Sequence, residues 1–164
     1  MSPKSNYLNF LKLNEKKLNT PDVKIVTAFY KFFEVSDTVT LQNLLKSIFN
    51  KTEIKGTILI AKEGVNGTIA GKINEITIVL EKLWSLDFLI DLEPKYSFAS
   101  KNPFFRMKIR QKKEIVTIGM PEISPNKIVG NYVKPENWND LISDKNLLLI
   151  DTRNSYEVSI GSFE

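Results

Sequence analysis

Residues 24–35, KIVTAFYKFFEV, are dense in β-branched and aromatic side chains, and a run of this length predicts a buried central strand. Asp37 and Thr38 come just after it and offer side-chain oxygens that cap helix N-termini. Apolar residues then recur at helical spacing, so we expect a helix whose apolar face points toward the core. This first apolar stripe consists of Leu41, Leu44, Leu45, Ile48 and Phe49.

The segment that follows repeats the pattern of strand and helix. Residues 55–62, KGTILIAK, predict a strand, and its return strand starts at 68–71. Between them, Asn66-Gly67 favours a type I′ hairpin turn, because both residue types tolerate positive φ. Asn74 is the candidate N-cap of a second helix. The apolar stripe of that helix consists of Ile73, Ile76, Leu80, Leu83 and Trp84.

The order of these elements predicts the α+β class. Strand, helix, strand, hairpin, strand, helix, strand is the split βαβ arrangement (βαββαβ) of the ferredoxin-like fold. Further strand is expected within 92–98, within 104–118, or in both. Right-handed crossovers place both helices over one face of the sheet, so the other face is left to solvent or to a partner.

Changes in composition divide the chain into four parts. The polar N-terminal arm is expected to be a loosely held segment or a short helix. A proline-containing linker interrupts both periodicities, and the last part opens with a helix-like turn at 133–138 and a short apolar strand at 147–150. One strand has almost nothing to pack against, so we expect the chain to stop inside a second domain. The four parts are the arm (1–23), the ferredoxin-like domain (24–118), the linker (119–130) and the truncated start of the second domain (131–164).

The composition excludes several classes of chemistry. The 164 residues contain no cysteine and no histidine, which removes thiolate nucleophiles, disulfides, imidazole bases and nearly every transition-metal site. No cofactor or metal site is evident. There is no apolar run of membrane-spanning length, and the N-terminus mixes charges into its apolar positions, unlike a signal peptide. We therefore expect a cytoplasmic protein with no membrane partner.

Basic residues are concentrated in one segment. The chain has a net charge of +4, and residues 101–113 alone carry six Lys and Arg and no acid. On a strand, side chains alternate between faces, so one face of FFRMKIRQKK is cationic and the other is apolar. Such a cationic ladder suits a phosphate backbone, although a solvated edge strand is the alternative interpretation. The cationic face comprises Phe104, Arg106, Lys108, Arg110 and Lys112, and the apolar face comprises Phe105, Met107, Ile109 and Gln111.

Two further groups of residues are candidates for binding or structural roles. The glycine-rich stretch 62–71 lacks the spacing of a Walker loop or a dinucleotide fingerprint, and we interpret it as a tight hairpin. Lys62 and Asn66 are expected within reach of a ligand at the tip of that hairpin. Asp151, Arg153 and Glu157 are expected to pair and to hold the end of the strand before them.

Four separated blocks together resemble the bacterial rhodanese-domain tRNA uridine hydroxylase family. They occur in the family's order, from about residue 24 onward. The resemblance implies an acylphosphatase-like, ferredoxin-like domain joined to a rhodanese domain. It also implies oxygen-dependent formation of 5-hydroxyuridine at the wobble position of tRNA. The blocks are ILIAKEGVNGTIAG (58–71), FFRMKIRQKKEIVTIG (104–119), GNYVKPENWNDLI (130–142) and LLLIDTRNSYEVSIGSF (147–163).

This resemblance also implies roles for residues and partners. Asp151, Arg153 and Glu157 belong to the first strand and turn of the rhodanese domain, and the active-site cysteine lies beyond Glu164. No residue of this chain is then catalytic, and the chain alone is expected to be inactive. Molecular oxygen is the implied co-substrate, and the implied partners are the tRNA anticodon loop and the protein's own rhodanese domain. The alternatives are a rhodanese-type sulfurtransferase and a non-catalytic interaction domain that docks on the rhodanese domain. The implied RNA-binding residues are Arg106, Lys108, Arg110, Lys112, Lys62 and Asn66.

Overall fold

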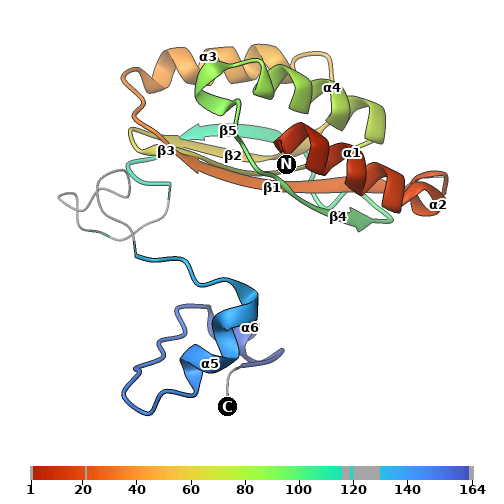
Figure 1. Cartoon of the computed structure of the whole chain (residues 1–164). Coiled ribbons are helices and arrows are strands. Elements are labelled where there is room, and N and C mark those ends of the chain that lie inside the picture. Colours follow the sequence, from red (N-terminus) through yellow and green to blue (C-terminus); the bar gives the residue numbers. More distant parts are fainter. Residues whose placement is uncertain (1, 21, 116–118, 120–129, 163–164) are drawn as a thin grey trace. The chain divides into compact units, whose positions relative to one another are not determined.

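The first predicted strand, β1 (Lys24–Phe32), belongs to a five-stranded sheet in the computed structural model (Figure 1). Neighbouring strands are antiparallel, except that β2 and β5 are parallel. The four strands in the order β4-β1-β3-β2 form the predicted ferredoxin-like arrangement, and β5 extends the sheet beyond β2. Both candidate regions for the last strand are therefore strands. The other four strands are β2 (Lys55–Ala61), β3 (Gly64–Gly71), β4 (Lys95–Ala99) and β5 (Met107–Gln111).

The structure describes residues 2–20, 22–115, 119 and 130–162, which fall in two compact units, 1–128 and 129–164. Of the predicted linker, only Gly119 and Gly130 are described. Residues 116–118, at the end of the second candidate strand region, also lie outside the described residues.

Two amphipathic helices, α3 (Thr38–Phe49) and α4 (Ile73–Trp84), cover one face of the sheet (Figure 1). The predicted cap of α3 is confirmed, since Asp37 Oδ1 accepts hydrogen bonds from the Val39 and Thr40 amides at 2.8 and 3.1 Å. The predicted cap of α4, Asn74, is wrong, because the helix starts two residues earlier than that cap implies and its N-cap, Lys72, makes no side-chain capping bond. Both apolar stripes face the core. The buried residues of the two helices are Leu41, Leu45, Ile48 and Phe49 of α3 and, of α4, Ile76, Leu80, Leu83 and Trp84 together with Val79, which was not part of the predicted stripe.

The N-terminal arm is a helix that packs on the same side of the sheet. Helix α1 (Pro3–Leu13) is followed by a single turn, α2 (Glu15–Leu18). Tyr7 of α1 is only 1% exposed, and its ring contacts Trp84 of α4 and Tyr96 of β4 at centroid distances of 5.9 and 5.2 Å. Of the two predicted forms, the short helix is therefore found, and it is not loosely held. In the described ranges, no helix combines the length and apolarity needed to cross a bilayer.

The turn of the β2–β3 hairpin is displaced from the predicted position. It consists of Lys62 and Glu63, whereas Asn66 and Gly67 lie inside β3, opposite Leu59 and Ile58 of β2. A Cβ on Gly67 would lie 3.0 Å from both Ile58 and Phe29, so this glycine allows close approach of neighbouring side chains. The local turn preference of Asn-Gly is thus overridden by pairing on both sides of β3.

Residues 130–162, the described part of the second unit, contain short helical elements only. The helix-like turn predicted at 133–138 is found as η2 (Pro135–Asn137) and the start of α5 (Trp138–Ile142), and α6 (Ser155–Val158) follows. The strand predicted at 147–150 is not formed, because no neighbouring strand pairs with it among residues 130–162. In the first unit, the remaining element is η1 (Asp87–Leu89).

Candidate nucleic-acid interface

Strand β5 lies at the edge of the sheet and presents two chemically different sides. Met107 and Ile109 pack against the hydrophobic core. Gln111 continues that side, since it bonds to Thr38 and Gln42 of α3 at 2.9 and 3.2 Å. The alternate positions carry the cations. Within 107–111 the predicted alternation is therefore confirmed, with Lys108 and Arg110 on the side away from the helices.

Backbone hydrogen bonds extend this pairing by one residue at each end of β5. The Gly56 amide donates to the Arg106 carbonyl at 3.2 Å, and the Lys112 amide donates to the Ile60 carbonyl at 2.8 Å. Arg106 and Lys112 therefore occupy the alternate positions on either side of Lys108 and Arg110. Three of the four side chains are exposed and Lys108 is half-buried. No ion pair joins any of them to an acid of the described residues. We call Arg106, Lys108, Arg110 and Lys112 the basic ladder.

The predicted faces do not extend back to the two phenylalanines before β5. Asn102 Oδ1 accepts from the Phe104 amide at 3.0 Å, and Asn102 Nδ2 donates to the Ala70 carbonyl at 3.1 Å. These bonds turn the chain just before the strand. Phe105 is consequently 97% exposed and does not share the apolar side of Met107.

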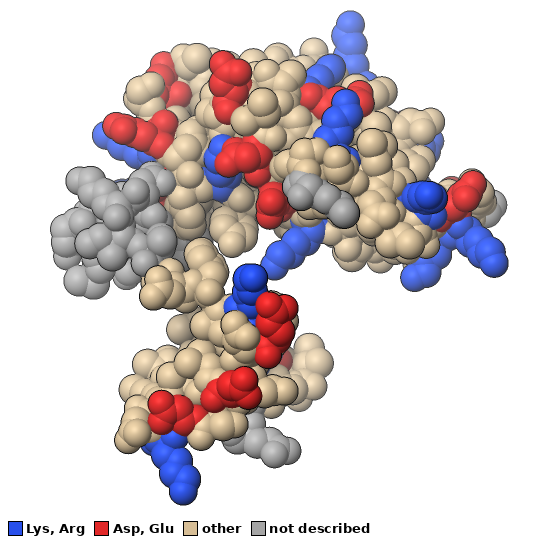
Figure 2. Space-filling model, viewed as in Figure 1, with Lys and Arg blue, Asp and Glu red and all other residues tan. Residues whose placement is uncertain are grey.

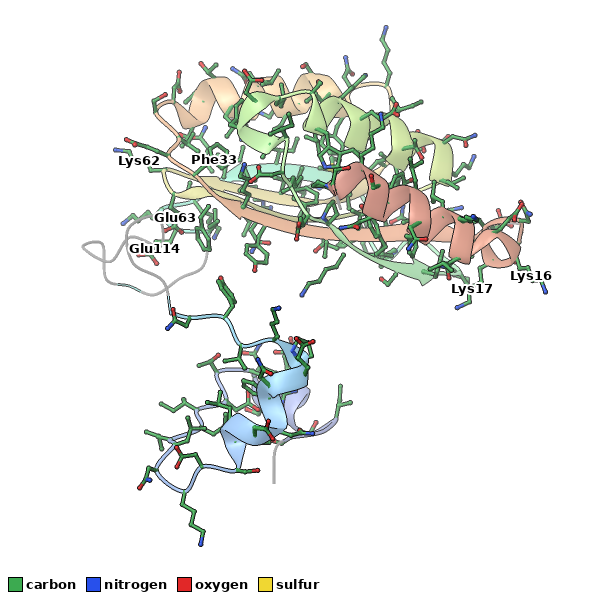
Figure 3. The ribbon with its side chains drawn as sticks, in the orientation of Figure 1. Lys16, Lys17, Phe33, Lys62, Glu63 and Glu114 are labelled. Carbon is green, nitrogen blue, oxygen red and sulfur yellow. The ribbon has the colours of Figure 1, made fainter. Side chains whose placement is uncertain are left out.

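The two residues predicted at the hairpin tip lie in different elements, Lys62 in the turn and Asn66 in strand β3. Lys62 is exposed in the turn of the β2–β3 hairpin (Figure 3). The same turn bonds to the chain just after β1, since the Phe33 amide donates to the Glu63 carbonyl at 2.9 Å. Asn66 lies along β3, and its Nδ2 donates to the Ile115 carbonyl at 3.4 Å. Glu63 Oε1 accepts from the Ile115 amide at 2.6 Å. Asn66 is therefore not at the tip, where it was expected.

The strand register places Asn66 on the same sheet face as the basic ladder. Leu59 is opposite both Arg110 and Asn66, and Asn66 is opposite Tyr30. We call this side, which no helix of the described first unit covers, the helix-free face. Its strand positions are Lys24, Val26, Ala28, Tyr30 and Phe32 of β1, Lys55, Thr57, Leu59 and Ala61 of β2, Asn66, Thr68 and Ala70 of β3, Lys95, Ser97 and Ala99 of β4, and Lys108 and Arg110 of β5.

The helix-free face carries three further lysines that are distant in sequence from the basic ladder. Strand pairing places these residues, Lys24, Lys55 and Lys95, on the same face as the basic ladder. All five described strands together contain no Asp or Glu, whereas the helix layer shows acids and bases side by side (Figure 2). Lys31 points to the helix side, where its Nζ donates to the Phe88 carbonyl at 2.8 Å and to Asp91. The face therefore suits a polyanion over much of its width.

A pocket of about 410 Å³ lies at the end of the sheet where β1 and β2 begin. Three lysines and two glutamates line it, with Gly71 and Asn102. Lys72 and Glu53 form an ion pair at 3.4 Å, and the Glu53 amide donates to Glu75 Oε1 at 2.7 Å. Because its charges are mixed, we do not assign a ligand to it. Within the described ranges, no three acidic residues are grouped as a metal site would require.

The three residues singled out near the C-terminal end lie in the second unit. Arg153 Nη2 lies 2.7 Å from Asp151 Oδ2 and also donates to the Gly161 carbonyl at 2.9 Å. The hydrogen bond from Arg153 lowers the pKa of Asp151 to about 2. Glu157 instead closes a capping box with Asn154, whose amide donates to Glu157 Oε2 at 3.1 Å. The predicted pairing is thus found for Asp151 and Arg153, whereas Glu157 caps α6.

A mixed five-stranded sheet with its helices on one face defines an acylphosphatase-like α+β domain. The UPF0176 acylphosphatase-like domain model matches residues 24–115, which is more than half of the chain. The chain belongs to this family.

Known proteins similar to this chain include a tRNA uridine(34) hydroxylase from Acaryochloris marina, which is 47% identical over 140 residues. These residues make up 85% of this chain and 45% of the relative, so the chain spans less than half of that protein's length. Among solved structures, an acylphosphatase from Coxiella burnetii aligns with a TM-score of 0.39 at 11% identity, over 54% of this chain and 94% of that one. Full-length HypF in its phosphate- and nucleotide-bound form aligns with a TM-score of 0.42 at 14% identity, over 58% of this chain and 13% of that one.

Proposed function

We propose that this chain is the N-terminal, tRNA-binding portion of an oxygen-dependent tRNA uridine hydroxylase that forms 5-hydroxyuridine at the wobble position. The 47% identity to a tRNA uridine(34) hydroxylase supports the reaction. The family assignment supports an N-terminal placement of the acylphosphatase-like domain. In this proposal a rhodanese domain begins near residue 131, and the protein acts in the cytoplasm.

The basic ladder carries the binding half of the proposal. Its four cations alternate along one edge strand and are paired with no acid among the described residues, so all four are free to bind phosphates. Phosphate contacts fix the position of an RNA without reading its bases. The ladder would therefore hold the anticodon stem or loop while the uridine is presented elsewhere.

The composition supports a protein in which this chain binds the tRNA and another part supplies the reactive thiol. The chain has neither cysteine nor histidine, so the thiol of the proposed rhodanese domain would have to come from outside these 164 residues. The role of this chain is then to bind and orient the tRNA, and molecular oxygen is the co-substrate of the whole protein.

Charge reversal of the ladder tests the binding role. The variant combines Arg106→Glu, Lys108→Glu and Arg110→Glu, and tRNA affinity is measured at low salt by filter binding or anisotropy. We expect a loss of at least about 100-fold, since each of the three close phosphate contacts contributes on the order of 1 kcal/mol. The matched control reverses three exposed lysines of the helix layer, Lys12, Lys46 and Lys82, which make the same change in net charge. Equal affinity of the two triple variants for tRNA would exclude the ladder as the RNA site.

The reaction is tested in cells that carry the intact gene. Disrupting the gene should remove 5-hydroxyuridine from position 34 of tRNA, as measured by mass spectrometry of digested tRNA. The ladder reversal, introduced into the intact gene, should lower that modification while the protein level stays normal. Unchanged 5-hydroxyuridine together with lost thiosulfate turnover would instead establish a sulfurtransferase.

A further inference from the structure

We propose that the helix-free face stacks an unpaired RNA base on Tyr30 while the basic ladder holds the flanking phosphates. This inference rests on the proposed tRNA binding and deepens it, because it names single-stranded RNA as the part of the ligand that lies on the sheet.

The strand register puts the aromatic ring and the cations in line. Arg110, Leu59, Asn66 and Tyr30 form one row across β5, β2, β3 and β1. Three inter-strand steps separate the ends of this row, which is about 14 Å at the usual strand spacing. Ile115 is hydrogen-bonded to Asn66 in the middle of this row, so RNA that joins a base on Tyr30 to a phosphate on the basic ladder would cross the sheet beside it, along the neighbouring row of Lys108, Thr57, Thr68 and Ala28.

Tyr30 is the exposed aromatic of this face. It is 53% exposed, although it lies in the middle of a sheet, and its neighbour on the same face of β1, Ala28, is small and also exposed. On the other side, Phe32 contacts its ring edge-on at a centroid distance of 6.1 Å. The phenol ring therefore packs against Phe32 and is still about half exposed. Aromatic rings held in this way on a sheet are the platforms on which single-stranded nucleic acids stack.

The charge on the face favours RNA over a protein partner. The neighbouring row runs from Lys108 through Thr57, Thr68 and Ala28 to Lys95, so a cation stands at each edge of the sheet beside the aromatic residue. No acid lies in any of the five described strands. A docking protein would need an acidic surface complementary to this pattern, whereas every single-stranded RNA combines the required phosphates with stacking bases.

Single substitutions at Tyr30 distinguish the contribution of base stacking to RNA affinity from that of the positive charges. The probes are a short oligouridine and an RNA duplex of equal length, and binding is measured at constant salt. Tyr30→Ala should weaken oligouridine binding by about 5- to 100-fold, the range for loss of one stacked base, and leave duplex binding unchanged. Tyr30→Leu, which keeps the apolar bulk, should lose as much as Tyr30→Ala, and Tyr30→Phe should bind like wild type. Ile78→Ala, an equally exposed apolar truncation on α4, should have no effect.

A fluorescent variant reports contact directly. In Tyr30→Trp, the new indole should emit as an exposed residue, in contrast to buried Trp84, and its emission should be quenched by oligouridine. Blue-shifted emission that does not respond to RNA would mean that another part of the protein covers this face, and it would overturn the inference. Oligouridine binding that is unchanged in Tyr30→Leu, or an equal loss for oligouridine and duplex, would also overturn it. If charge reversal of the basic ladder still weakens tRNA binding in those cases, only the inference about Tyr30 is overturned and the proposed function is retained.

Discussion

The phenol oxygen of Tyr7 lies 2.7 Å from Thr77 Oγ1, and this contact joins helices α1 and α4. Thr77 Oγ1 also lies 2.8 Å from the Ile73 carbonyl, to which it donates its single proton. Tyr7 is therefore the donor in its bond to Thr77. Its burial raises the pKa of the phenol, which keeps the hydroxyl protonated. Helix α1 is thus an integral part of the first unit, although it precedes the region matched by the family.

Truncation of Tyr7 should destabilise the first unit. Tyr7→Phe removes one hydrogen bond and should lower the free energy of unfolding by about 1 kcal/mol. Tyr7→Ala also removes a ring that contacts Trp84 and Tyr96, so we expect a loss of about 3 to 5 kcal/mol. Urea unfolding followed by circular dichroism measures both. Leu8→Ala, at the exposed neighbouring position, is the control, and an equal effect there would show that α1 does not pack as described.

Much of the fold follows from local patterns in the sequence. The apolar stripes of α3 and α4 and the alternation around Met107 and Ile109 depend on residues only a few positions apart, so they are readable without knowing the fold. The predicted position of the hairpin turn is wrong because Asn66-Gly67 has a strong local turn preference that pairing with two neighbouring strands overrides. The local sequence does not decide the form of the N-terminal arm, because α1 is fixed by contacts to α4 and β4, which are distant in sequence.

The candidate site could be predicted only in part. The basic ladder is contiguous in the sequence, and strand alternation is enough to place its members on one side. Lys24 and Lys95 reach the same face only through pairing of β1 with β3 and β4, which no local spacing encodes. Tyr30 lies in the aromatic-rich first strand, but its exposure depends on the side of the sheet that the helices leave free, which the local sequence does not encode.

Gly64 should be the least replaceable glycine of the hairpin. Its φ is +143°, and a Cβ there would lie 2.1 Å from the Lys31 carbonyl oxygen of the neighbouring strand. Gly64→Ala must therefore separate β1 from β3, and we expect a loss of about 3 kcal/mol in unfolding free energy. Thermal or urea unfolding measures it. Gly130→Ala has no atom within 4 Å of the new Cβ and should stay near wild type. A wild-type midpoint for Gly64→Ala would contradict the described register.

The contribution of the Asp151–Arg153 pair to the stability of the second unit should be lost only in strong acid. The pKa of Asp151 is lowered to about 2 from the model-compound value of 3.8, chiefly by the hydrogen bond from Arg153. A depressed carboxyl pKa contributes stability above pH 3.8, and this contribution is lost as the pH falls through about 2. The titration midpoint of the Asp151 carboxyl carbon, followed by NMR, should lie near 2. Arg153→Gln should raise it toward 3.8, and Arg153→Lys should give an intermediate value. A midpoint that does not change in Arg153→Gln would exclude the arginine as the cause.

The salt dependence of tRNA binding counts the phosphates that the ladder contacts. Each contact to a single-stranded segment releases counterions and contributes about −0.7 to the slope of log K against log salt concentration. Lys108→Ala and Arg110→Ala should therefore each make the slope shallower by about 0.7, and the double variant by about 1.4. Lys82→Ala, on the exposed side of α4, should leave the slope unchanged.

If a ladder variant loses affinity and keeps the wild-type slope, that cation acts through protein structure and not on a phosphate. If all variants keep both slope and affinity, the ladder is a solvated edge whose charges only prevent strand-to-strand association.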